Sequence, residues 1–299
     1  MIRSQRKLVP ALTCVWGCLI GLLVAAEHPH AQEKSFLWQV RSEQGTLYLL
    51  GSIHFLKKEH FPLNKAIDEA FERSGRLVLE IDIKSADPVK IQQLTLQKGM
   101  NTDGTTLRQN VSQETYSLAE RRAKQLGMDL RSLAPFRPWL VALTMQSLML
   151  QRLGLSTDFG VDRYLAGRAE KAGKPVAGLE TAEFQIGLFD QFSLRDQELM
   201  LRETLKELDV IEKNVERIVQ MWLKGNVSAL EDLLLAGMRE YPEVHQKLLV
   251  DRHRRWLPQI EKMIQRGDRA IVVVGAAHLV GKDGVIALLR ERGYTVEQL

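Results

Sequence analysis

Cysteine is nearly absent from this chain of 299 residues. Only Cys14 and Cys18 occur, and both fall within the first 26 residues. The remaining chain therefore has neither disulfides nor thiolate metal ligands available to it. Any metal site in that part has to be built from His, Asp and Glu.

The motifs of several common enzyme classes are also missing. The chain has no His-Glu-x-x-His, no Gly-x-Ser-x-Gly, no Walker loop and no dinucleotide fingerprint, so we predict no nucleotide cofactor. The net charge is only +4, and Arg3, Arg6 and Lys7 supply three of those charges. No basic stripe with interleaved aromatic residues appears elsewhere, which argues against a nucleic-acid partner.

The N-terminus has the pattern of an export segment. A positive start precedes an apolar run that ends in the small residues Val24-Ala25-Ala26, a suitable cleavage site. The run is also long enough for an uncleaved membrane anchor. We predict a signal peptide or anchor over residues 1–26 and a linker over 27–35. The rest would be exported to the periplasm or outside the cell, and only the N-terminal segment would meet the membrane.

The remainder predicts one α/β domain over residues 36–299. Apolar runs and turn residues indicate a β-hairpin over 36–54 and strands over 76–82, 174–180, 269–278 and 294–299. Short continuous apolar runs are typical of parallel strands covered on both faces. We therefore expect a mostly parallel central sheet flanked by helices. A helical insertion or cap is expected at about 88–155, and a further helical region at about 187–265.

One short pattern occurs twice in matched settings. Gly51-Ser-Ile-His54 and Gly275-Ala-Ala-His278 each follow an apolar strand, and two other strands end on Glu80 and Glu180. Ligands of open α/β sheets bind at the carboxyl ends of parallel strands. The two glycines let a strand turn sharply and let other groups approach closely. We therefore expect His54, His278, Glu80 and Glu180 at one edge of the sheet.

Two kinds of chemistry fit these four residues. Imidazole and carboxylate ligands suit Zn, Mn, Fe or Co. The same groups could act without a metal, with a His or Glu as general base toward water. Other polar residues are given ordinary roles: Asp162 as a group of a helix first turn, Arg252 as part of a solvated basic face, and His60, His245 and His253 as ordinary histidines.

The chain resembles the TraB/GumN family, which is itself similar to the Tiki proteases and more remotely to the ChaN and erythromycin-esterase-like folds. The resemblance rests on "LLGSIHF", "LVLEID", "GVDRYLAGRAEKAGKPVAGLET" and "RAIVVVGAAHLVGKDGVIALLRERGY". It implies that His54 and His278 are the signature histidines and that Glu80, Glu180 and Arg252 match the family's other site residues. His253 departs from the asparagine expected after that arginine.

Together these features predict an exported, peptidase-like hydrolase that depends on a divalent metal, Mn, Co or Zn. His54, His278 and Glu80 would hold the metal, Glu180 would be a further ligand or the base, and Arg252 would stabilise an oxyanion or a substrate carboxylate. Its partner would be a peptide or small-molecule substrate. A metal-independent His/Glu esterase or amidase and a non-catalytic protein that binds metal, haem or a small ligand remain the alternatives.

Overall fold

The computed structural model describes residues 34–83, 87–208, 210–239 and 241–299. The predicted export segment and most of the predicted linker lie outside these residues. Within them, no helix combines the length and the apolar character needed to cross a membrane.

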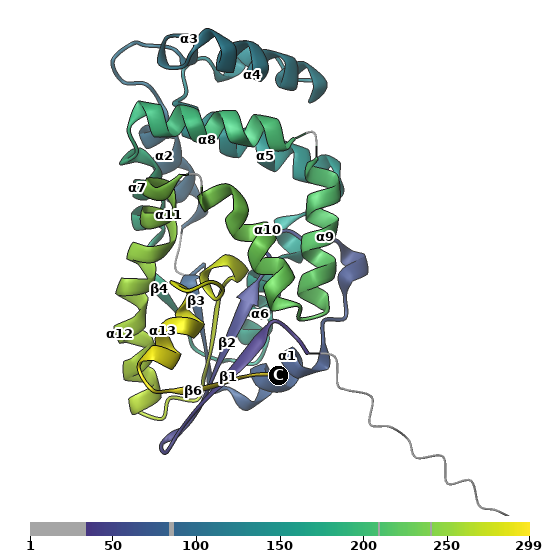
Figure 1. Ribbon diagram of the computed structural model, residues 1–299, viewed down its shortest axis with the longest axis vertical. Coiled ribbons are helices and arrows are strands. Elements are labelled where there is room, and N and C mark those ends of the chain that lie inside the picture. Colours follow the sequence, from purple (N-terminus) through teal and green to yellow (C-terminus); the bar gives the residue numbers. More distant parts are fainter. Residues whose placement is uncertain (1–33, 84–86, 209, 240) are drawn as a thin grey trace, which may run out of the picture. The chain divides into compact units, whose positions relative to one another are not determined.

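The described chain contains strands near both of its ends and long helical stretches between its third and fourth strands and between its fourth and fifth strands (Figure 1). The strands are β1 (Leu37–Ser42), β2 (Gly45–Ser52), β3 (Arg76–Ile81), β4 (Val176–Glu180), β5 (Ala270–Gly275) and β6 (Thr295–Gln298). The α-helices are α1 (Lys65–Arg73), α2 (Pro88–Gly99), α3 (Leu107–Asn110), α4 (Gln113–Gln125), α5 (Pro138–Arg152), α6 (Val161–Lys171), α7 (Ala182–Asp190), α8 (Leu194–Glu207), α9 (Ile211–Leu223), α10 (Val227–Arg239), α11 (Pro242–His245), α12 (Asp251–Gln265) and α13 (Val285–Glu291). The short helical segments are η1 (Lys58–His60), η2 (Leu130–Leu133), η3 (Thr157–Phe159), η4 (Gln246–Val250) and η5 (Ala276–His278).

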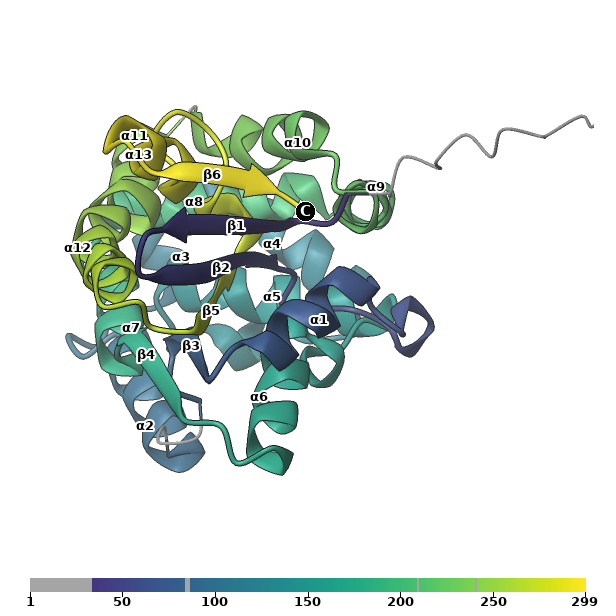
Figure 2. The ribbon, with the colours of Figure 1, turned by 90° about the horizontal axis from the view of Figure 1, so that it is seen from below.

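The six strands form one sheet in the order β4-β3-β5-β2-β1-β6 (Figure 2). The pairs β4–β3, β3–β5 and β5–β2 are parallel, while β1 is antiparallel to both of its neighbours. Every residue of β5 is buried, as expected for a strand with covered faces. The prediction of an α/β fold with a mostly parallel sheet is confirmed.

The strand order brings the four predicted site residues to one edge. Going along the sheet, Glu180 ends β4, Glu80 lies near the end of β3, His278 follows β5, and His54 follows β2. The registry of β2 and β5 sets Ser52 opposite Gly275, so the two Gly-x-x-His loops leave the sheet side by side. The four residues therefore lie at the carboxyl edge of the parallel strands, where the sequence predicted them.

Helices lie on both sides of the sheet. In Figure 2, α12 is on one side of the strands, and α1 and α6 are on the other. A separate hydrophobic cluster joins α4, α5 and α8, with buried residues that include Ala119, Met145 and Leu201. Residues 88–155 are mostly helical, as predicted (Figure 1). Their interpretation as an insertion, like the predicted domain boundaries, stays a prediction.

Gly51 is the tightest point of the first Gly-x-x-His segment. A Cβ there would clash with the ring of Phe36, which is fully buried, and would lie 3.1 Å from the Cα of Ala276. The carbonyl oxygen of Gly51 accepts a hydrogen bond of 2.6 Å from Nε1 of Trp222. The absence of a side chain at Gly51 therefore lets Phe36 and Ala276 pack directly against β2.

We predict that Gly51→Ala lowers the free energy of unfolding by about 1–3 kcal/mol, the usual cost of overpacking a core. Chemical denaturation followed by circular dichroism measures it. The matched control is Gly167→Ala in α6, where a Cβ meets no atom within 4 Å and should stabilise the helix slightly. Equal effects at the two glycines would contradict the argument.

Candidate active site

The two Gly-x-x-His motifs meet at Gly275. The position that a Cβ of Gly275 would occupy lies 3.2 Å from Nε2 of His54, 3.3 Å from Oε1 of Glu80 and 3.5 Å from Cδ2 of His278. Because glycine has no Cβ, these three side chains can crowd against the end of β5. The structure thus brings together two histidines that are far apart in the sequence.

His54 is held by a carboxylate from α6. Its Nδ1 donates a hydrogen bond of 2.7 Å to Oδ2 of Asp162, and Ser52 Oγ donates one of 2.9 Å to Oδ1. The interpretation of Asp162 as an ordinary group of a helix first turn is therefore incomplete, because its carboxylate orients a histidine. With Nδ1 held in this way, Nε2 of His54 faces the space at Gly275.

This contact changes the acidity of His54. Burial acts to lower its pKa, but the charge of Asp162, the hydrogen bond to Asp162 and the charge of Glu80 outweigh burial and the opposing charge of Arg252. Together they raise the pKa of His54 to about 9. The ring is therefore an imidazolium at neutral pH, although 54% of its side chain is exposed.

Glu80 is a buried carboxylate with several donors. Its Oε1 accepts the N–H of Gly275 at 2.7 Å, and its Oε2 accepts Nε2 of Gln185 at 2.9 Å as well as Nη2 of Arg252. Burial alone would raise the pKa of Glu80. The His278 ring, the Arg252 guanidinium, the His54 ring and the Gly275 N–H instead hold it well below its usual range. Glu80 is thus ionised.

Arg252 lies in the interior, between two carboxylates. It is 7% exposed, so its assignment to a solvated basic face is wrong. Its Nε and Nη2 donate to Oε1 of Glu180 at 2.9 and 2.5 Å, and Nη2 also donates to Glu80. Its Nη1 contacts the carbonyl oxygen of Leu248 at 3.1 Å and Nε2 of His278 at 2.9 Å. All five guanidinium N–H groups therefore have a protein acceptor.

The surroundings of Arg252 also fix Glu180. The ring of Trp256 lies 4.6 Å from the guanidinium carbon, and its Nε1 donates to Oε2 of Glu180 at 3.0 Å. Nε2 of Gln185 donates to both Glu180 and Glu80, at 2.9 Å each. Gln185 and Trp256 were not predicted from the sequence, and they link the two carboxylates and the guanidinium into one network.

His253 also belongs to this network. The sequence favours an ordinary histidine at this position, but its Nε2 lies 2.9 Å from Nδ1 of His278, and its Nδ1 lies 2.7 Å from the carbonyl oxygen of Asp283. The two histidines, His253 and His278, are 1% and 5% exposed, respectively. The departure at position 253 therefore falls on a direct contact of the second signature histidine.

A pocket opens onto one part of the network. Its volume is about 340 Å³, and its polar lining includes His54, Glu80, Asp162 and Gln185. Phe55, Leu79, Ile81 and Ile83 form its apolar lining. Glu180, Arg252 and His278 do not line it. The five predicted site residues thus divide into two that face the pocket and three that lie behind them.

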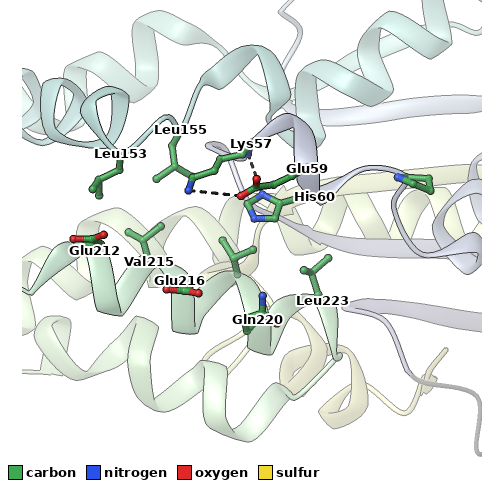
Figure 3. A pocket seen from close by; sticks show the side chains of 12 residues that line it. Lys57, Glu59, His60, Leu153, Leu155, Glu212, Val215, Glu216, Gln220 and Leu223 are labelled. Atoms are coloured by element: carbon green, nitrogen blue, oxygen red, sulfur yellow. Dashed lines mark hydrogen bonds and ion pairs between the residues drawn. The ribbon is translucent and has the colours of Figure 1, made fainter.

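A larger pocket of about 550 Å³ lies elsewhere, between η1 and α9 (Figure 3). Lys57, Glu59 and His60 face Val215 and Glu216 of α9 across it. None of the predicted site residues lines this pocket. We therefore take the smaller pocket, with its paired histidine and carboxylate, as the candidate active site.

The metal set predicted from the sequence is only partly open to an ion. Nε2 of His54 and Oε1 of Glu80 both face Gly275, and Nε2 of His278 is 3.6 Å from Oε1 of Glu80. That His278 nitrogen, however, contacts Arg252. Among the described residues, no group of three or more His, Cys, Asp or Glu is arranged to hold a metal. Of the three predicted donors, His278 is the one whose nitrogen is already engaged by Arg252, and the ligand set stays a prediction.

Fold and site define an α/β protein whose polar centre lies beyond the carboxyl ends of its parallel strands. The chain belongs to the TraB/PrgY/gumN family, whose model matches residues 36–298. The resemblance inferred from the sequence motifs is confirmed.

Several relatives cover most of the chain. A protein of Escherichia coli called YbaP, itself uncharacterised, is 25% identical over 81% of this chain and 87% of its own length. An uncharacterised protein of Treponema pallidum is 20% identical over 95% of this chain and 88% of its own length. The zebrafish (Danio rerio) protein named Metalloprotease TIKI2 is 22% identical over 88% of this chain and 60% of its own. No solved structure matches.

We predict that Asp162→Asn lowers the pKa of His54 from about 9 toward the ordinary 6.5, because the substitution removes the carboxylate charge. Titration of the His54 ring protons by NMR measures this. Asp158→Asn is the matched control, since Asp158 is exposed and pairs with Arg163 at 3.5 Å. An unchanged His54 pKa in Asp162→Asn would contradict the assignment.

The same pKa shift gives a pH dependence of stability. Since folding raises the pKa of His54, the protonated pair stabilises the fold fully below about pH 6.5. This contribution is lost as the pH rises through about 9. Unfolding curves of the chain and of Asp162→Asn should therefore differ most below pH 6.5 and converge above pH 9.

Proposed function

We propose that the chain is a hydrolase that cleaves a peptide or a related acyl compound in the pocket where His54 and Glu80 meet. The observation that carries the proposal is the convergence of His54 Nε2 and Glu80 Oε1 at Gly275, together with the pocket that His54 and Glu80 both line. The family membership and the relative named a metalloprotease support the same class of reaction.

The two groups have opposite acid–base states. The environment raises the pKa of His54 and lowers that of Glu80, and such a divergence is the usual mark of an acid and base pair. Glu80 orients a water and accepts its proton as the oxygen attacks the substrate carbonyl. His54 then gives its Nε2 proton to the leaving nitrogen as the C–N bond breaks. Proton return from Glu80 to His54 closes the cycle.

The other residues support this pair. Asp162 holds Nδ1 of His54, and Nε2 of the same ring faces the space at Gly275. Arg252 and Gln185 keep Glu80 ionised and fixed. Glu180, which we predicted as a ligand or base, balances the charge of Arg252 in this mechanism. Contact of Arg252 with a substrate oxyanion stays a prediction, and it requires one of the present hydrogen bonds to open.

The pocket lining fits the predicted substrate class. Apolar residues such as Leu79 and Ile83 can contact an apolar side chain of the substrate, while His54 and Glu80 can interact with the polar bond beside it. We further propose that the hydrolase works outside the cytoplasm, in the periplasm or extracellular space. The positive and apolar N-terminal 26 residues support export.

A metal-dependent form of the same hydrolysis is the second candidate, favoured by the name of the zebrafish relative. His54 Nε2 and Glu80 Oε1 would hold Mn, Co or Zn, and His278 would join them only if Arg252 left its Nε2. A bound ion would polarise the carbonyl and lower the pKa of water.

The test is digestion of a peptide library by the purified chain, followed by mass spectrometry. We expect cleavage, and we expect Glu80→Gln to slow it about 100-fold or more because the proton acceptor is lost. His245→Gln, on the half-buried α11, is the control and should keep full activity. No cleavage of any peptide or ester by the chain, with or without added Mn, Co or Zn, would sink the proposal. Loss of activity in a chelator would favour the metal-dependent form.

The pH profile gives an independent prediction. With His54 as the proton donor, kcat/KM should stay level around neutral pH and fall as the pH rises through about 9. A rate that instead increases up to pH 9 would assign His54 as the base and contradict the proposed roles of His54 and Glu80.

A further inference from the structure

We propose that His253 fixes the tautomer of His278, so that His278 positions Arg252 and serves neither as a metal ligand nor as a base. The observation is a continuous chain of contacts from Arg252 Nη1 to His278, from His278 to His253, and from His253 to the backbone carbonyl of Asp283. The proposal rests on the proposed function only for its effect on turnover.

The two ends of the chain of contacts set its direction. A guanidinium can only donate a hydrogen bond, so Nε2 of His278 must accept from Arg252. A carbonyl oxygen can only accept, so Nδ1 of His253 must carry a proton. The middle contact joins His278 Nδ1 and His253 Nε2 at 2.9 Å, and one of the two has to donate.

The two fixed ends leave a single solution. Because Nε2 of His278 accepts from Arg252, it carries no proton, and the proton of this ring must lie on Nδ1. His278 therefore donates from Nδ1 to Nε2 of His253. His253 then carries its only proton on Nδ1, where it donates to the carbonyl oxygen of Asp283.

This tautomer has a consequence for Arg252. The lone pair of His278 Nε2 is directed at Nη1, and it competes with any metal for the same position. Were the proton on Nε2 instead, two donors would face each other at 2.9 Å. The guanidinium would then be displaced from Glu80 and Glu180. His253 and His278 thus determine where the charge that holds both carboxylates lies.

The test is NMR of the purified chain with ¹⁵N-labelled histidine at pH 7, with the His278 and His253 signals assigned by loss in His278→Gln and in His253→Gln. Long-range ¹H–¹⁵N correlations distinguish protonated from unprotonated ring nitrogens. We expect a protonated Nδ1 and an unprotonated Nε2 for both residues. We also expect no shift of the His278 Nε2 signal on addition of Zn²⁺. A proton on His278 Nε2, or a zinc-induced shift there, would overturn the proposal.

Two variants separate positioning from packing. His253→Leu removes the acceptor for His278 Nδ1, whereas His253→Gln supplies an amide oxygen at a similar reach. We expect the leucine variant to lose the single His278 tautomer and the glutamine variant to keep it. An unchanged tautomer in a folded leucine variant would show that His253 does not set it. If that variant fails to fold, the spectra of the unaltered chain still show whether His278 and His253 carry their protons on Nδ1.

Turnover then separates this proposal from the proposed function. In the hydrolysis assay, kcat should fall about tenfold in His253→Leu with KM little changed, and it should recover in His253→Gln. If NMR shows the expected tautomers but the chain hydrolyses nothing, the proposal for His253 and His278 holds and the proposed hydrolase function is wrong. If the chain hydrolyses its substrate but His278 has the opposite tautomer, the hydrolase function holds and the proposal for His253 and His278 is wrong.

Discussion

The structure depends on one buried ion cluster, in which the guanidinium of Arg252 lies between Glu80 and Glu180. Two carboxylates that share an interior site cannot both stay ionised without a compensating charge. Arg252 supplies that charge, and Gln185 and Trp256 donate further hydrogen bonds to the carboxylate oxygens. A buried charge is costly unless it is paired and fully hydrogen-bonded, and in this cluster every guanidinium N–H has an acceptor. The ionised state of Glu80, on which the proposed chemistry rests, follows from this arrangement.

The sheet explains how residues from distant parts of the chain reach that cluster. Parallel neighbours β4, β3, β5 and β2 end at the same edge, and each delivers one polar residue there. Helix α12, far along the chain, contributes Arg252, His253 and Trp256 from its buried face. Gly275 leaves the space in which the strand-end residues approach each other. The site is thus divided into a pocket side, with His54 and Glu80, and a supporting side, with His278, Arg252 and Glu180.

The sequence predicted the strand-end residues because polar residues after continuous apolar runs have one natural place, the edge of a parallel sheet. It failed where a contact depends on two elements at once. Asp162 has an adequate local role in the first turn of its helix, and nothing near it in the sequence signals His54. Arg252 was proposed as a site residue only from the family resemblance, because the basic run around it otherwise indicates a solvated face. A usable signal existed, because Arg252 lies one helical turn before Trp256 and Trp256 one turn before Ile260, on a single buried face. The tautomer of His278 could not be predicted, since it depends on Arg252 and His253 of α12, which contact His278 only in the folded chain.

The central claim is that Arg252 holds both carboxylates, and a double-mutant cycle of unfolding free energies tests it most directly. Arg252→Leu alone leaves Glu80 and Glu180 buried without their cation and should cost about 3–5 kcal/mol. In a background that carries both Glu80→Gln and Glu180→Gln, the same substitution should cost far less, because no uncompensated charge remains. The account predicts a large coupling energy between the arginine and the two glutamates. Additive effects, with Arg252→Leu equally costly in both backgrounds, would contradict it.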